Sequence, residues 1–319
     1  MPPITSYTKP LNEAQAVKLR ALLMQQGWEF ETKPHCLYAA SRGKVNVAVY
    51  QKGPKILVQG KETEDFVTLV LEPQILGQAE LGYEEVLHPE MFQPHIGVDE
   101  SGKGDFFGPL VIAGVYVDAA AARHLREAGA VDSKRITSDA KIEQVAQAIR
   151  SVPGLRYEIV QINPERYNAL YEKFGNLNRL LAWGHAKVIE LLLERVPDCP
   201  QALSDQFANP AVLQRALQAK GREIELIQRT KAESDPAVAA ASVLAREKFV
   251  HWLRDTGLQT GIPLPKGVSA LVKASARQML QAHGSAGLAK VAKWHFKTTA
   301  EILSSSDSEG GGTALPQPA

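Results

Sequence analysis

The chain has 319 residues, of which 45% are hydrophobic and 22% charged, and its formal net charge is +1. The length allows two globular domains, and so small a net charge excludes a global field toward nucleic acid, so any electropositive surface must be local. No apolar run reaches membrane length, no signal peptide is visible, and the only cysteines, Cys36 and Cys199, lack metal-ligand spacing. We therefore expect a cytoplasmic protein, without contact with a membrane, that has neither a disulfide framework nor a zinc site.

Residues 1–75 are predicted to form a small α+β domain. Apolar positions recur at helical spacing over residues 11–26, and a closing helix is expected over residues 62–71. Turn signals separate three strand-like runs between these helices: residues 36–40, 45–50 and 55–58. Over residues 1–70 there are nine Lys and Arg against six Asp and Glu, which gives this unit a charge of +3.

Residues 76–93 are expected to be an acidic linker. The stretch 71–98 holds five glutamates, no Lys or Arg, and scattered Pro and Gly. Its contrast with the basic unit before it supports a domain boundary here.

Residues 94–302 show strands and helices in alternation, which predicts an α/β domain. Strands are expected at residues 95–100, 109–117, 156–162, 201–205 and 223–228. Helices are expected at residues 139–151, 164–196, 210–220, 236–255 and 269–283. Residues 303–319 are rich in Ser and Gly and are expected to form a disordered tail.

The most informative stretch is residues 97–109, where an apolar strand ends in two carboxylates and a glycine-rich turn follows. Asp99 and Glu100 are adjacent, and Gly102, Lys103 and Gly104 come directly after Ser101. Carboxylates bind hard divalent cations, and a turn without Cβ atoms lets the backbone approach a phosphate closely. The stretch therefore predicts metal-assisted chemistry on a phosphodiester.

Two other interpretations of this stretch are weaker. Gly97 to Lys103 fits the spacing GxxxxGK of a phosphate-binding loop, but the next residue is Gly104 instead of Ser or Thr, and a strand follows instead of a helix. A plain hairpin with solvated acids explains the glycines, but it does not explain a pair of acids joined directly to a Val-rich strand.

Further acids follow strand-like runs or precede a helix. Asp205 ends the run 202–205, and Glu233 lies just before Asp235 and Pro236, which are a typical N-cap and first helical residue. From the residues alone, Glu233 is equally well a metal ligand near a helix dipole or a capping residue. Successive strand residues face opposite sides, so Asp99 and Glu100 share a metal only if the chain bends there.

Several motifs in order give the chain a resemblance to the type 2 ribonucleases H, and the Gly-Lys-Gly at residues 102–104 resembles ribonuclease HIII, where ribonuclease HII has Gly-Arg-Gly. The resemblance extends over residues 94–300, and more weakly over the first 75. It is carried by the residues 97–109, 131–134, 176–187, 231–235 and 294–299.

This resemblance implies a ribonuclease H-like fold, with a mixed central sheet flanked by helices. It also implies a TATA-binding-protein-like N-terminal domain, which binds the substrate. It implies cleavage of the RNA strand of RNA/DNA hybrids by two Mg²⁺ or Mn²⁺ ions, which leaves 3′-hydroxyl and 5′-phosphate ends. The catalytic and metal-binding residues implied are Asp99, Glu100, Asp205 and Glu233. The substrate-binding residues implied are Ser101, Gly102, Lys103, Gly104, Ser133 and Lys134.

Glu233 stands where the ribonuclease HII pattern has Asp, which also favours the HIII branch. Two alternatives stay open: a ribonuclease HII-like enzyme that incises at single ribonucleotides, and a non-catalytic hybrid-binding protein. No obligate protein partner is evident, and we expect a monomer. His185 and Trp183 are interpreted as core residues, while His95 and His295 receive no role.

Overall fold

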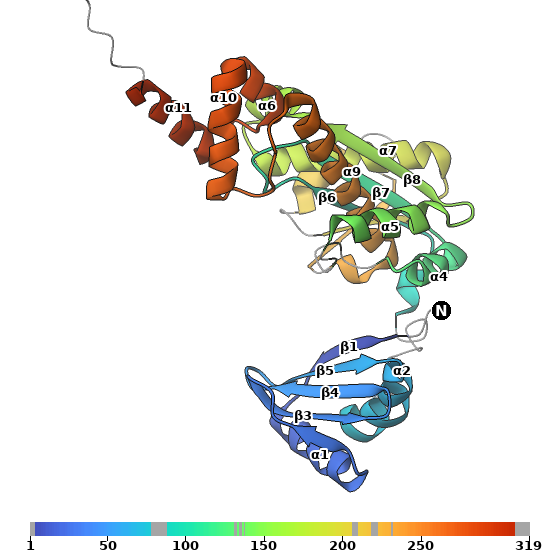
Figure 1. Cartoon of the computed structure of the whole chain (residues 1–319). Helices are drawn as coiled ribbons and strands as arrows, with labels where there is room; N and C mark the ends of the chain where they lie inside the picture. Colours follow the sequence, from blue (N-terminus) through green and yellow to red (C-terminus); the bar gives the residue numbers. More distant parts are fainter. Residues whose placement is uncertain are drawn as a thin grey trace, which may run out of the picture. The chain divides into compact units, whose positions relative to one another are not determined.

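The computed structural model describes residues 4–77, 88–130, 133, 136, 138–205, 210–217, 223–230 and 232–309. The chain divides into two compact units, residues 1–90 and 91–319, and each is described here by itself (Figure 1).

The first unit is a five-stranded antiparallel sheet with helices on one face. The strand order is β1-β5-β4-β3-β2, with β1 (Ser6–Pro10), β2 (Glu29–Glu31), β3 (Cys36–Arg42), β4 (Val45–Tyr50) and β5 (Lys55–Gly60). The three strands predicted from the sequence are confirmed. The two edge strands β1 and β2 escaped prediction because they are short and largely exposed, so they carry little apolar periodicity.

Helix α1 (Glu13–Gln25) confirms the predicted N-terminal helix, and Asn12 and Gln15 form a capping box at its start. The predicted closing helix is longer than expected. Helix α2 (Thr63–Phe66) continues as the π-helix η1 (Val67–Leu76), which takes in the first residue of the expected linker. A spacing of four residues buries Val67, Leu71 and Ile75 in the core of this unit, so packing holds the helix together across Pro73.

The second unit is built on a mixed five-stranded sheet of order β10-β9-β6-β7-β8 (Figure 1). Its strands are β6 (His95–Ser101), β7 (Leu110–Val117), β8 (Arg156–Ile162), β9 (Gln201–Asp205) and β10 (Glu225–Arg229). Strands β6, β9 and β10 are parallel, while β7 runs antiparallel to both β6 and β8. All five predicted strands and the mixed sheet flanked by helices are confirmed.

The helices of this unit differ from the prediction in several places. Helix α10 (Ala270–Val291) continues past its predicted end at residue 283, after the non-helical Gly284. The long helix expected over residues 164–196 is two helices, because Gly175 takes φ 62° and Asn176 caps the next one. Helix α4 was not foreseen. Helix α11 runs to Glu309, so the expected disorder from residue 303 is corrected for its first part, while residues 310–319 lie outside the described ones. The helices are η2 (Pro89–Phe92), α4 (Ala119–Glu127), α5 (Asp139–Arg150), α6 (Pro164–Phe174), α7 (Leu177–Arg195), α8 (Pro210–Ala216), η4 (Ala232–Ser234), α9 (Pro236–Thr260), α10 (Ala270–Val291) and α11 (Lys297–Glu309).

Two helices cover opposite faces of this sheet, and each needs a glycine for close approach. Helix α9 packs on β6, where a Cβ at Gly97 would lie 2.3 Å from the backbone nitrogen of Val238. Helix α7 packs on β7 from the other side, where a Cβ at Gly184 would lie 2.7 Å from Ile112. Each face has its own apolar cluster. Among the helices described, none combines the length and apolarity that a membrane crossing requires.

Candidate active site

Asp99 and Glu100 end strand β6 and project to opposite faces of the sheet. The pairing of β6 with β7 is regular through Asp99, Glu100 and Ser101, so the chain does not bend between the two acids. Since Gly97 faces helix α9, alternation places Asp99 on the α9 side and Glu100 on the α7 side. The chain leaves the strand only at Gly102, after both acids.

Glu100 is held by a buried histidine of helix α7. His185 is fully buried, and its Nε2 lies 3.0 Å from Glu100 Oε2, while its Nδ1 lies 3.2 Å from Ser204 Oγ on strand β9. Burial acts to raise the pKa of Glu100, but the hydrogen bond and charge of His185, together with the charge of Lys103, hold it below its usual value. The carboxylate is therefore kept ionised and oriented.

The sequence interpretation of His185 as a core residue is right about its burial and misses this contact. A polar side chain in the middle of an otherwise apolar helix face was the available signal, because a buried imidazole requires polar partners. Which partners it meets depends on β6 and β9, which are far from it in the sequence.

Asp205 lies beside Asp99 at the same edge of the sheet. The parallel register pairs Val98 with Ser204, so Asp99 and Asp205 are the next residues on neighbouring strands. Leu203 packs with Val238 of helix α9, and alternation places Asp205 on that same side. Asp99 and Asp205 therefore share one face at the carboxyl ends of two parallel strands.

Glu233 lies in the short helix η4, between strand β10 and helix α9. The cap of α9 is Asp235, whose Oδ1 accepts the N–H groups of Ala237 and Val238. The structure thus separates Glu233 from the capping role that the sequence alone left open. Pro236 is the first helical residue, as predicted.

His95 braces this cap from strand β6. Its Nε2 lies 3.0 Å from Asp235 Oδ1 and its Nδ1 lies 2.7 Å from the carbonyl oxygen of Gln93. Burial acts to lower the pKa of His95, and the hydrogen bond and charge of Asp235 outweigh it and raise that pKa. His95 therefore has a positioning role at the start of helix α9.

The four acids suit a hard divalent cation in their chemistry, and Asp99 and Asp205 also suit it in their strand positions. All offer carboxylate oxygens, the ligands that Mg²⁺ and Mn²⁺ prefer. Within the described part of the chain, however, no three His, Cys, Asp or Glu side chains come together closely enough to hold a metal ion. Glu100 in particular lies on the α7 side, where it contacts His185.

The turn after β6 contains two glycines, which differ in the space around the position where a Cβ atom would lie. Gly102 has φ 87°, and a Cβ there would lie 2.2 Å from the carbonyl oxygen of Pro109. Gly104 has open space where a Cβ would be built. Between them, the Nζ of Lys103 lies 3.5 Å from Glu100 Oε1, and its side chain is 39% exposed.

Ser133 is buried against helix α9, and Lys134 lies outside the described residues. Ser242 Oγ donates to Ser133 Oγ at 2.6 Å, and the Arg246 guanidinium donates to the Ser133 carbonyl oxygen. The structure thus shows Ser133 as an anchor for its segment. The hydroxyl already has a protein partner.

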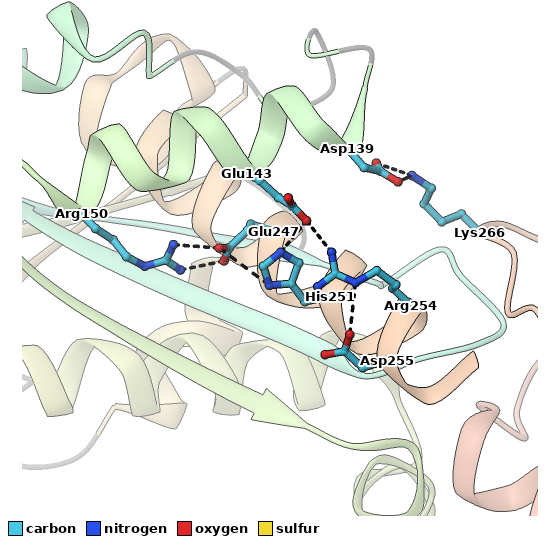
Figure 2. Close-up of polar contacts among 8 residues, drawn as sticks. All are labelled: Asp139, Glu143, Arg150, Glu247, His251, Arg254, Asp255 and Lys266. Carbon is cyan, nitrogen blue, oxygen red and sulfur yellow. Dashed lines mark hydrogen bonds and ion pairs between the residues drawn. The ribbon is translucent and has the colours of Figure 1, made fainter. Parts of the chain in front are cut away.

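A polar network fixes helix α5, which follows this segment, to helix α9 (Figure 2). Arg150 donates to both carboxylate oxygens of Glu247, at 2.8 and 2.7 Å. Glu143 Oε1 lies 2.7 Å from His251 Nε2 and accepts from Arg254 at 2.8 Å. Helix α5 and Ser133 are therefore both attached to helix α9.

Comparisons with known proteins agree with this architecture. The sequence model of the ribonuclease HII family matches residues 96–299. The chain is 41% identical over 303 residues to ribonuclease HIII of Protochlamydia amoebophila, which covers 95% of this chain and 98% of that protein. It is 43% identical to ribonuclease HIII of Chlamydia muridarum, over 94% and 98% of the two chains.

Among solved structures, the crystal structure of Bst-RNase HIII in complex with Mn²⁺ has a TM-score of 0.66 and 26% identity, and it covers 95% of this chain and 100% of that one. Aquifex aeolicus RNase H3 has a TM-score of 0.51 and 28% identity, over 91% and 100% of the two chains. Identity above 40% to relatives that this chain covers almost completely is far more than a shared fold requires. The chain therefore belongs to the ribonuclease HIII family and is an endonuclease of the ribonuclease H class.

Proposed function

We propose that this chain cleaves the RNA strand of RNA/DNA hybrids by metal-assisted hydrolysis, which leaves 3′-hydroxyl and 5′-phosphate ends. The observation that carries the proposal is the placing of Asp99 and Asp205 at adjacent register positions on one face of the sheet, with Glu233 following the next strand. Family membership points to the same chemistry. The proposal includes a monomer in the cytoplasm without an obligate protein partner.

In this mechanism, Asp99, Glu100, Asp205 and Glu233 would hold two Mg²⁺ or Mn²⁺ ions, and Glu100, which lies on the opposite face of β6 from Asp99, would do so from the α7 side. When bound, such ions activate a water for in-line attack and stabilise the charge on the leaving oxygen. His185 keeps Glu100 ionised and oriented through the 3.0 Å contact. Asp235 and His95 fix the start of helix α9 and so set the position of Glu233.

The turn 101–104 is assigned to the ribose and phosphate of the RNA strand. A protein distinguishes RNA from DNA at one nucleotide by the 2′-hydroxyl, and a backbone without Cβ atoms can approach that group closely. Gly104 offers such an approach, since nothing lies within 4 Å of the position of its missing Cβ. Lys103 is exposed enough to reach a phosphate, and Lys134 is assigned to a second phosphate contact.

A test of this function compares three labelled duplexes in Mg²⁺ and in Mn²⁺: an RNA/DNA hybrid, DNA with four embedded ribonucleotides, and DNA with one. We expect cleavage of the first two, little cleavage of the third, and none in excess EDTA. Product ends are identified by their response to phosphatase and to ligase.

Efficient cutting at the single ribonucleotide would replace this proposal by a ribonuclease HII-like activity. Binding without cleavage in either metal would leave a hybrid-binding protein as the better account. Nucleotide hydrolysis, which a phosphate-binding loop would require, serves as a further negative control.

We also propose that residues 1–75 grip the hybrid with the open face of their sheet. The helices cover one face, where Val47 and Val58 are buried. By alternation the other face carries Tyr50 paired with Lys55, together with Asn46 and Gln59. An aromatic ring beside a lysine on a basic unit suits stacking and phosphate contact.

Two variants test this role. The full-length double substitution Tyr50→Ala and Lys55→Ala, and a chain that starts at Met91 where the second unit begins, are both expected to raise KM for the hybrid more than they lower kcat. The double variant should raise KM by about tenfold, since one stacking contact is worth about 1–3 kcal/mol. An unchanged KM in both would argue for a structural or partner-binding role instead.

A further inference from the structure

A lysine in the second unit is completely buried against the loop that joins the two central strands. Lys293 follows helix α10 and has no exposed surface. Its Nζ donates to the carbonyl oxygens of Asp105 at 2.9 Å, Phe107 at 3.3 Å and Gly108 at 2.6 Å. An ammonium group has three N–H donors, so all of them are used by one short stretch of backbone.

The backbone around Lys293 runs along the same loop. The Lys293 N–H donates to the carbonyl oxygen of Phe106 at 2.9 Å, the Gly108 N–H donates to that of Val291 at 2.9 Å, and Phe107 forms an antiparallel bridge with Ala292. The segment 291–293 therefore pairs with the loop like a short extra strand. The ammonium group of Lys293 bonds carbonyl groups of the same loop.

Burying a charge carries a large desolvation free energy, and an apolar side chain of the same length would fill this space without it. Burial lowers the pKa of Lys293 to about 7, while the charge of Asp105 acts in the opposite direction. The rings of Tyr167 and Phe249 lie 5.6 and 6.0 Å from Nζ and give the cation further support. The three carbonyl oxygens and the two rings thus stabilise the charged form of Lys293 against the cost of burial, at a position where packing alone requires no charge.

The same loop leads directly out of the glycine turn. Phe249 lies against both ends of the loop, since Cβ atoms built at Gly102 and Gly108 would lie 3.0 and 2.8 Å from its ring. Strand β7 begins at Leu110, so residues 102–109 have no sheet partner of their own on β6 or β7. Their path is held by the burial of Phe106 and Phe107, by hydrogen bonds with Gly267, and by the hydrogen bonds of their carbonyl groups to Lys293.

We propose that Lys293 is a positioning residue, whose ammonium group fixes the carbonyls of Asp105, Phe107 and Gly108 and thereby holds the turn 102–104 in the conformation that distinguishes ribose from deoxyribose. This inference rests on the proposed role of that turn. In this inference Lys293, which follows helix α10, affects substrate selection through the turn and does not itself contact the substrate.

The test compares wild type with Lys293→Met, which keeps the length of the side chain and removes the charge. Two quantities are measured: amide hydrogen exchange across residues 101–110, and the ratio of Kd for an all-DNA duplex to Kd for the RNA/DNA hybrid of the same sequence, without divalent metal. We expect faster exchange in that stretch alone, and a ratio lowered by about tenfold, because small displacements of positioned groups have large effects. Leu193→Ala, in the other core cluster, is the control for a general loss of stability and should leave the ratio unchanged.

Asn168→Ala provides a second variant should Lys293→Met fail to fold. The Asn168 amide donates to the carbonyl oxygens of Ala289 and Ala292, and its own oxygen accepts the Trp294 N–H. Its loss should loosen the segment that carries Lys293 and shift both quantities in the same direction by less. Unchanged exchange and an unchanged ratio in a folded variant would overturn the inference. A wild-type ratio near one would instead count against the proposed function of the turn.

Discussion

Replacing Asp99 by Asn is expected to abolish cleavage of the hybrid while leaving its binding largely intact. The substitution keeps the size of the side chain and one accepting oxygen, and it removes the negative charge that favours binding of a divalent cation. Asp99 ends strand β6 beside Asp205, so the change falls at the centre of the proposed acid cluster. We expect kcat to fall by at least roughly 10²–10³, the size found when one electrostatic stabiliser of a transition state is removed.

Asp198→Asn is the matched control, since Asp198 is an exposed acid of the same unit, after helix α7. It should cleave like wild type. Binding is measured by fluorescence anisotropy, and cleavage by gel under single-turnover conditions. Near-normal cleavage by Asp99→Asn would remove Asp99 from the mechanism and with it the assignment of the cluster.

Two alanine substitutions in the glycine turn are expected to separate stability from binding. Gly102→Ala should lower the stability of the protein, whereas Gly104→Ala should weaken its binding of the hybrid. Gly102→Ala places a methyl group 2.2 Å from the Pro109 carbonyl oxygen, in a left-handed backbone conformation. The combined strain and clash should lower the free energy of unfolding by about 2–4 kcal/mol. For a unit of this size, that loss corresponds to a Tm lowered by roughly 5–15 °C.

Gly104→Ala meets open space, so its Tm should stay within about 2 °C of wild type. Its methyl group would stand where the ribose is proposed to approach, and Kd for the hybrid should rise about tenfold, or about 1.4 kcal/mol. Calorimetry and anisotropy on the same preparations separate the two effects. Wild-type affinity in Gly104→Ala would contradict the proposed contact of the turn with the ribose.

Lys103→Ala extends this comparison to charge. Loss of one phosphate contact should reduce the slope of log K against log salt by about one. The Nζ of Lys103 also lies 3.5 Å from Glu100 Oε1. The substitution therefore changes the surroundings of Glu100 as well, and it does not serve as a stability control. An unchanged slope would show that Lys103 serves Glu100 and not the nucleic acid.

Much of the central sheet was predictable because its strands are apolar runs that can be recognised in the local sequence. The run 110–117 is apolar at nearly every position, and in the structure β7 is buried on both faces. Asp99 was predicted as a site residue because it ends an apolar run, while the residues around Asp205 suggested it only weakly and the family resemblance added the rest. Strands β1 and β2 were not found, since an exposed edge strand owes its existence to its neighbour more than to its own side chains.

The order of residues by itself determined the pair of acids at the end of a strand, the glycine turn after it, and the start of helix α9 at Asp235 and Pro236. These are local features, set by side-chain alternation, backbone freedom and capping. Only the tertiary structure decided that Asp99 and Glu100 stay on opposite faces, that His185 holds Glu100, and that Lys293 grips the loop beyond the turn. The first follows from the pairing of β6 with the neighbouring strand β7, whereas the last two depend on contacts between residues 85 to 188 positions apart. A buried polar group shows its partner only once the fold has brought the two together.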